Sequence, residues 1–154
     1  MILSYRNTES VDMQKCIDIR GMTRDNPITI DELARIGVNA ANWCPLIESG
    51  EFLGEICEAN DVVVGFCFGE VESGEILVLA VLPEYEGMGI GTKLLANVVN
   101  KLLQSGSNSL WLAASPDPII RAHGFYRVLG WAYTGNLDAN GDQILVLQNL
   151  PKSE

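Results

Sequence analysis

Three glycines at alternate positions, Gly87, Gly89 and Gly91, mark the most informative stretch of this sequence. They follow an apolar run at residues 75–81 that predicts a buried strand, and a helical pattern begins directly after them. Glycine lets the backbone come close to a ligand, and the first amides of a helix have no partner within that helix. Together with the positive end of the helix dipole, these amides predict a binding site for a diphosphate.

Three kinds of ligand carry a diphosphate that such a loop could bind. A nucleotide-binding P-loop needs Gly-Lys followed by Ser or Thr, whereas Thr92 and Lys93 come here in the reverse order. A dinucleotide-binding loop belongs to the first β-α-β unit of a chain, with an acidic residue about 20 positions later. This loop instead follows a predicted meander of three strands. Coenzyme A is the third ligand.

The loop and its flanking residues resemble the GNAT superfamily of N-acetyltransferases. Residues 86–91 read Glu-Gly-Met-Gly-Ile-Gly, where the family has Arg or Gln, two variable residues, Gly, one variable residue, and Gly or Ala. Residues 79–85 are similar to the strand that precedes this loop in the family. Residues 121–131 look like the family's Ala-x-x-Phe-Tyr-x-x-x-Gly-Phe segment. The resemblance is specific from about residue 50 onward.

The resemblance implies an α+β protein with a GNAT-like fold, organised as a single domain over residues 1–154. Its central sheet is expected to be mixed and mostly antiparallel, with about seven strands flanked by about four helices. It also implies acetyl-CoA as the co-substrate and no metal ion. The expected activity is transfer of an acetyl group to a primary amine of a small molecule or peptide, by direct attack in a ternary complex. A non-catalytic domain that binds or senses acyl-CoA is the alternative.

By the same resemblance, CoA is expected to contact the end of the strand and the loop that follows it, at Leu79, Ala80, Val81, Glu86, Gly87, Met88, Gly89, Ile90, Gly91 and Thr92. Position 86 departs from the family pattern, because Glu86 stands where relatives carry Arg or Gln. A carboxylate beside a diphosphate is repelled unless it points away. Met88 supplies no cation either, so backbone amides must carry most of the binding, helped from a distance by Lys93 and Arg121. We therefore expect weakened affinity for CoA.

Two side chains could move protons in such a reaction. Tyr126 matches the family tyrosine that protonates the departing sulfur, and a phenol with a pKa of about 10 is protonated at neutral pH. In a purely structural role, Tyr126 would pack beside Ala122 and Leu129. Glu75 stands where the histone-acetylating branch keeps its catalytic glutamate, and it could accept the amine's proton directly or through water. It could equally be a solvated carboxylate at the start of a strand. A backbone N–H near Val81 is expected to stabilise the developing oxyanion.

The acceptor side of the family is built largely from the N-terminal helices and the loop between them, together with the hairpin of the last strands. In this sequence those locations point to Arg24, Asp25, Asn26 and Trp43 as substrate-binding residues, with Tyr133 of the hairpin as a further candidate. Asp25 could pair with a cationic amine, whereas Trp43 could equally anchor the core. The sequence does not identify the amine.

These candidate residues depend on a scaffold that the sequence pattern also predicts. Strands are expected at residues 1–6, 51–59, 62–72, 75–81, 110–114, 131–134 and 143–147. Helices are expected near residues 13–20, 29–36, 94–104 and 119–129, with a further short helical stretch at 43–48. The helix at 94–104 has a broad apolar stripe, and its predicted polar side carries Lys93, Asn97, Asn100, Lys101 and Gln104.

Composition argues against several other classes of protein. A net charge of −10 repels nucleic acid at long range. The longest apolar run, residues 76–82, is far shorter than the roughly 18 residues of a membrane span, and no signal peptide is visible, so we expect a cytoplasmic protein that does not bind membranes. The four cysteines lack the spacing of a zinc site and there is one histidine, so no metal is expected. A homodimer is compatible with the family, but the sequence does not decide it.

Overall fold

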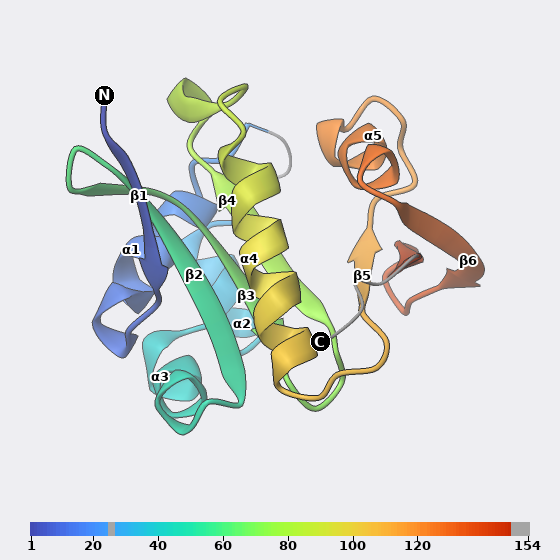
Figure 1. Ribbon diagram of the computed structural model, residues 1–154, viewed down its shortest axis with the longest axis horizontal. Helices are drawn as coiled ribbons and strands as arrows, with labels where there is room; N and C mark the ends of the chain where they lie inside the picture. The colour runs from blue at the N-terminus through green and yellow to red at the C-terminus, as the bar shows by residue number, and fades with distance from the viewer. Residues whose placement is uncertain (25–26, 149–154) are drawn as a thin grey trace.

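The computed structural model describes residues 1–24 and 27–148, and Figure 1 shows how its elements are arranged. Within these residues the elements are, in chain order, β1 (Leu3–Asn7), the 3-10 turn η1 (Ser10–Asp12), α1 (Met13–Arg20), α2 (Ile30–Arg35), α3 (Ala40–Ser49), β2 (Phe52–Ala59), β3 (Val62–Glu70), β4 (Ile76–Val81), the 3-10 turn η2 (Pro83–Tyr85), α4 (Ile90–Gln104), β5 (Trp111–Ala114), α5 (Arg121–Val128), β6 (Trp131–Leu137) and β7 (Gln143–Leu147). The α+β class and the seven strands are as the sequence predicts.

The described residues contain five α-helices rather than about four, because the short stretch around residue 43 forms the full helix α3. Its first turn is capped by Asn39, whose side chain accepts the backbone N–H of Asn42 at 2.8 Å. The helix also contains Pro45, a residue that helix interiors disfavour. The cap of α2 is as predicted, since Thr29 Oγ1 accepts the N–H of Glu32 at 3.2 Å.

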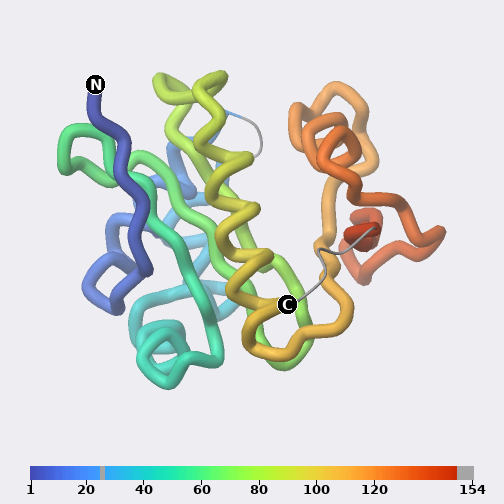
Figure 2. Tube along the Cα trace, in the orientation of Figure 1, coloured from blue at the N-terminus to red at the C-terminus, as the bar shows by residue number. Residues whose placement is uncertain are grey.

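The strands form two antiparallel sheets, ordered β1-β2-β3-β4 and β5-β7-β6. One parallel bridge joins them, between Glu75 and Trp111, where the N–H of Trp111 donates to the carbonyl of Gly74 at 3.1 Å. Beyond this bridge β4 and β5 diverge, as the tube in Figure 2 shows. The combined sheet is therefore mixed, mostly antiparallel and split between its two central strands.

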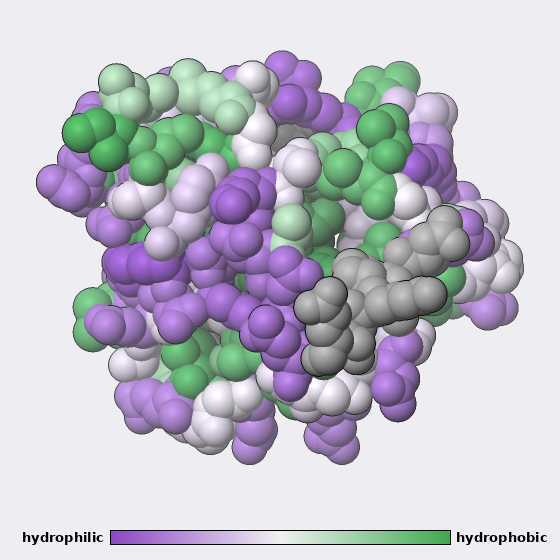
Figure 3. All heavy atoms as spheres, in the orientation of Figure 1, coloured by the Kyte–Doolittle hydropathy of each residue, from purple (hydrophilic) through white to green (hydrophobic). Residues whose placement is uncertain are grey.

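Helices cover both faces of the first sheet, with α4 on one face and α1 to α3 on the other (Figure 1). The buried side chains accordingly form two clusters, one containing Leu94, Val98 and Leu102 of α4 and the other containing Ile17 and Leu33. The solvent side of α4 is largely hydrophilic in Figure 3. No helix within the described residues is long and apolar enough to span a membrane.

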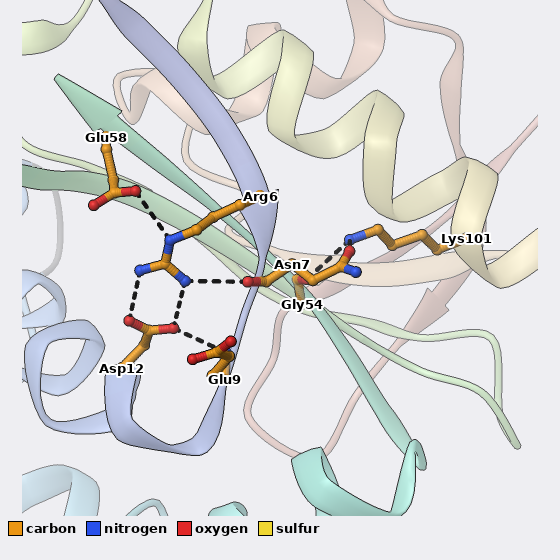
Figure 4. Close-up of polar contacts among 7 residues, drawn as sticks. All are labelled: Arg6, Asn7, Glu9, Asp12, Gly54, Glu58 and Lys101. Carbon is orange, nitrogen blue, oxygen red and sulfur yellow. Dashed lines mark hydrogen bonds and ion pairs between the residues drawn. The ribbon is translucent and has the colours of Figure 1, made fainter. Parts of the chain in front are cut away.

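Two residues expected on the polar, solvent side of α4 instead tie this helix to the sheet. Glu55 of β2 is 5% exposed and accepts a hydrogen bond from Asn97 Nδ2 at 2.9 Å. Lys101 forms an ion pair with the other oxygen of Glu55, and its ammonium also donates to the carbonyl of Gly54 at 3.0 Å. Figure 4 shows Lys101 reaching across to Gly54 and Asn7. The prediction of a solvated face is therefore wrong at Asn97 and Lys101, because a buried carboxylate needs these partners.

Replacing Lys101 with Met should lower the free energy of unfolding by about 3 kcal/mol, because Glu55 would be left buried without this cation. Urea denaturation followed by circular dichroism measures the change. The control is Lys93→Met on the exposed side of the same helix, where we expect a change within about 0.5 kcal/mol. Equal unfolding midpoints for the two variants would contradict a stabilising role for the Glu55 pair.

A second ionic cluster fixes β1 to the turn η1 (Figure 4). Both terminal nitrogens of Arg6 donate to the carboxylate of Asp12, each at 2.8 Å, and its Nε donates to Glu58 at 2.9 Å. The hydrogen bonds from Arg6 hold the pKa of Asp12 below its ordinary 3.8. Because folding lowers the pKa of Asp12, the Arg6–Asp12 pair contributes its full stabilisation at pH values above 3.8. This contribution is lost as the pH falls through the lowered pKa of the folded protein.

Candidate functional site

The glycine loop joins β4 to α4 through the turn η2, and two of its glycines have backbone angles that favour glycine. Gly87 has a φ of 78° and Gly89, the N-cap of α4, has a φ of 80°. Ile90 directly follows and is 1% exposed, so the first turn of the helix is anchored in the core. A Cβ at Gly87 or Gly89 would meet no atom within 4 Å. The loop therefore leaves open space beside the first amides of α4, as a diphosphate site requires.

A cleft of about 370 Å³ lies along this loop. Every residue predicted to bind the cofactor lines it except Met88, whose side chain is 46% exposed and points elsewhere. The opposite wall comes from α5, including Arg121, Ala122 and Phe125. A Cβ added at Gly91 would lie 3.5 Å from the ring of Phe125 and 3.9 Å from Leu79, so this glycine keeps the cleft open.

The free edge of β4 also presents hydrogen-bond donors to this cleft. Leu82 donates its N–H to the carbonyl of Val64 in β3 at 2.9 Å. Successive amides of a strand point to opposite edges, so the N–H groups of Leu79 and Val81 point away from β3 and toward the split beside β5. This orientation agrees with the predicted oxyanion donor near Val81.

Glu86 does not point away from the cleft; it lies between two arginines in its wall. Its carboxylate is 2.5 Å from a guanidinium nitrogen of Arg121 and 3.6 Å from one of Arg24. All three residues line the cleft, whereas Lys93 does not. Two guanidinium groups are thereby gathered beside the glycine loop and compensate for the absence of a cation at Met88. Arg24, predicted to bind the acceptor, lies in this cleft and not among the residues that line the second cavity described below.

Replacing Glu86 with Gln should tighten CoA binding about 3- to 10-fold, because the change removes a negative charge beside the phosphates and leaves both arginines to them. Isothermal titration calorimetry at two salt concentrations measures the change, which should shrink at the higher one. Glu84→Gln, on an exposed neighbour outside the cleft, serves as the control. Unchanged affinity at low salt would show that Glu86 does not oppose the phosphates.

A second cavity, of about 450 Å³, lies between α1, α2 and the split strands. Trp43 lines it and packs edge-on against Phe52 and Phe68, at centroid distances of 4.8 and 5.4 Å. It is thus both a cavity wall and a member of the core, the two roles that the sequence left open. Asp25 and Asn26, the other predicted acceptor residues, lie outside the described residues.

The two cavities meet at Leu79 and Tyr126, which line both of them together with Thr23 and Ala122. Tyr126 is half-buried, and its ring packs edge-on against Phe125 and Trp131 at 5.2 and 6.3 Å. Burial raises the pKa of Tyr126 above its ordinary value, whereas the positive charge of Arg20 acts to lower it. The phenol therefore keeps its proton at neutral pH beside the junction.

The structure places Glu75, the predicted base, away from this junction. Glu75 pairs with Trp111 where β4 and β5 are still adjacent, and it lines neither cavity. Four residues separate it from Leu79, which is about 13 Å along a strand. Burial and the charges of Glu70 and Asp138 raise the pKa of Glu75. Its assignment as the base stays a prediction.

Sequence analysis missed two ionisable residues of the second cavity, Arg20 and Asp142. Arg20 ends α1 and looked like an ordinary charge in the last turn of a helix. Asp142 directly precedes β7 and looked like part of a turn. The family resemblance pointed to the hairpin that contains Asp142 but not to this residue, and the pairing of distant strands and helices brings Asp142 and Arg20 to one cavity. Within the described residues there is no cluster of three or more His, Cys, Asp or Glu side chains that could hold a metal.

Solved structures with this fold come from N-acetyltransferases. PaiA N-acetyltransferase from Thermoplasma acidophilum, in complex with CoA, is 18% identical with a TM-score of 0.79, and the match covers 96% of this chain and 99% of that one. YncA from Salmonella typhimurium, with acetyl-CoA, is 17% identical with a TM-score of 0.75 and coverage of 100% and 97%. Naa50 from Arabidopsis thaliana, bound to the bisubstrate analogue CoA-Ac-MVNAL, is 21% identical with a TM-score of 0.67 and coverage of 95% and 97%.

The split sheet and the glycine-lined cleft thus belong to an α+β fold that this chain shares with these N-acetyltransferase structures. The chain belongs to the GNAT acetyltransferase family: the sequence model described as "Acetyltransferase (GNAT) family" matches residues 24–131. Members of this family use acetyl-CoA as the co-substrate, and the open backbone at Gly87 and Gly89 fits its diphosphate. A comparison with curated protein sequences finds no match.

Proposed function

We propose that this protein, acting as a single cytoplasmic domain over residues 1–154, transfers the acetyl group of acetyl-CoA to a primary amine of a small molecule or peptide. The meeting of the two cavities at Leu79 and Tyr126 carries the proposal. An acyl group reaching along the cleft from the glycine loop would meet an amine entering from the second cavity. That geometry suits direct attack within a ternary complex.

The chemical step joins the amine nitrogen to the thioester carbonyl carbon and breaks the carbon–sulfur bond. An acceptor bound as an ammonium first releases one proton to solvent. The neutral nitrogen then loses one proton on attack, and the departing sulfur takes one up. During attack, negative charge develops on the carbonyl oxygen, and the amides of Leu79 and Val81 are suitably directed to stabilise it. The residues of this chain thus supply orientation, hydrogen-bond donors and proton transfer.

Tyr126 is the proposed acid that protonates the sulfur. Its raised pKa keeps it in the phenol form before the step, and the positive charge of Arg20 favours the transient tyrosinate. Glu75 is the base that the family resemblance implies, and from its place on β4 it could act only through intervening water.

The proposal is supported by the acceptors that appear in related structures. Naa50 was solved with a peptide-containing bisubstrate analogue, and aminoglycoside 6'-acetyltransferase type Ii, 20% identical with a TM-score of 0.72, acts on a small molecule according to its name. Both classes of acceptor carry amines, and the second cavity is large enough for a small amine or the first residue of a peptide.

The test is release of free thiol from acetyl-CoA in the presence of a panel of primary amines, with CoA binding measured separately by calorimetry. Amine-dependent thiol release supports an acetyltransferase. Saturable CoA binding without turnover on any amine indicates the alternative, a domain that binds or senses acyl-CoA. A protein that binds no CoA, and whose Tm does not rise with CoA, would have neither function.

A further inference from the structure

Strand register places Asp142 at the same level as Leu79, across the split in the sheet. Residue 75, directly before β4, is bridged in parallel to residue 111 of β5, so Leu79 corresponds in height to Ser115. In β7, Gln143 pairs with Ala114, and the antiparallel register therefore brings Asp142 beside Ser115. Asp142 is therefore at the level of Leu79, where the two cavities meet. Glu75 lies four positions before Leu79 along the chain.

The second cavity has an unusual balance of charge for a protein that binds amines. Most of its wall is apolar, contributed for example by Met13, Ile17, Leu33 and Phe66. Among the described residues that line it, Asp142 is the single carboxylate and Arg20 the single cation. Although the whole chain carries a net charge of −10, the described lining of this cavity contributes one negative charge.

We propose that the acceptor is an amine with one positive charge and an apolar body, and that Asp142 binds its ammonium group while the apolar wall takes up the rest. This inference rests on the proposed acetyltransferase function and names its substrate class. Asp142 is half-buried with Asp138 near it, and burial first and Asp138 second raise its pKa. An ammonium beside Asp142 would offset both the burial of its carboxylate and the like charge of Asp138.

Amines with several charges fit this cavity poorly. A second ammonium would have to be buried against apolar side chains or approach the guanidinium of Arg20. A small polar amine would leave the wall around Phe66 and Ile17 unfilled. An acceptor with one positive charge and an apolar body can pair with the carboxylate of Asp142 and bury its body against the apolar wall.

Three primary amines separate these possibilities: 2-phenylethylamine, with one charge and an apolar body; ethanolamine, with one charge and no apolar body; and 1,4-diaminobutane, with two charges. Thiol release from saturating acetyl-CoA gives kcat/KM for each. We expect 2-phenylethylamine to exceed the other two by about 30-fold, as burial of a phenyl group implies. An equal or greater value for the diamine would overturn this inference while leaving an acetyltransferase. If the protein binds CoA but releases no thiol with these three amines or with a wider panel of amines, the proposed function itself is overturned.

Side-chain variants test the role of Asp142 directly. Asp142→Asn should lower kcat/KM for 2-phenylethylamine about 10- to 100-fold, mainly through KM, with the Kd for CoA unchanged. Asp117→Asn, outside both cavities, should leave both quantities unchanged. If Asp142→Asn has the activity of the wild type, or if Glu75→Gln raises KM and Asp142→Asn does not, Asp142 does not bind the ammonium.

A rim variant provides a second test that does not depend on the half-buried aspartate. Ile36 is 69% exposed yet lines the second cavity, whereas Ile30, 50% exposed on the same helical segment, does not. Ile36→Glu adds a carboxylate at the entrance and should shift the ratio of kcat/KM values at least about 3-fold toward the diamine. Ile30→Glu should not change the ratio. Equal ratios in both variants would show that the acceptor does not use this cavity.

Discussion

Replacement of Tyr126 with Phe is expected to lower kcat about 100- to 1000-fold, the usual contribution of a positioned general acid. The hydroxyl is the only group lost, and Tyr126 lies where the cofactor cleft and the second cavity meet. The ring contacts with Phe125 and Trp131 do not involve that hydroxyl, so the Tm should be nearly unchanged. Thiol release at saturating acetyl-CoA, together with thermal unfolding, measures both effects.

The matched control is Tyr5→Phe, which removes a phenol from β1, at the opposite edge of the first sheet. It should leave kcat unchanged. Because burial raises the pKa of Tyr126, the wild-type rate should rise with pH as the acceptor amine loses its proton, with no decline near the ordinary tyrosine pKa of about 10. A Tyr126→Phe enzyme with the wild-type rate would remove this residue from the mechanism.

Replacement of Gly91 with Leu is expected to weaken CoA binding about 50-fold, corresponding to an overpacking cost of roughly 2 kcal/mol. A Cβ at this position already contacts the ring of Phe125 and the side chain of Leu79, and the further atoms of leucine must enter the cleft. The fold itself should tolerate the change, because leucine favours a helix more than glycine does. Calorimetric titration with CoA and thermal unfolding separate these effects.

Ala96→Leu is the control for this substitution, since Ala96 lies on the exposed side of the same helix, outside the cleft. It adds three side-chain carbons to α4, against four for Gly91→Leu, without entering the site. We expect its Kd for CoA to equal that of the wild type. If Gly91→Leu also binds CoA normally, the diphosphate does not lie against the first turn of α4.

The sequence alone predicted much of the fold and a set of residues that, except for Met88, line one cleft. The apolar run before the loop, the alternate glycines and the stripe on α4 are all encoded by neighbouring residues, and local backbone preferences and periodicity therefore reveal them. The same holds for the cap at Thr29, which needs only the four residues from 29 to 32. These features depend on neighbours in the chain, and for them the prediction agreed with the structure, whereas the length of α3 was underpredicted.

Other features depend on residues far apart in the sequence, and only the tertiary structure decided them. Lys101 looked like a solvated lysine, yet the buried Glu55 draws it to the sheet. Glu86 looked like a repulsive charge, yet Arg121 and Arg24 meet it across the cleft.

The acceptor side shows the same dependence most clearly. Asp142 reaches the level of Leu79 only through the combined register of β4, β5 and β7, and the residues between them carry no signal of it. The sequence by itself predicted the glycine loop and the helix that begins after it, because both are encoded by neighbouring residues. Tertiary packing determined which charges surround the acceptor, because electrostatic energy depends on distance in space and not on separation along the chain.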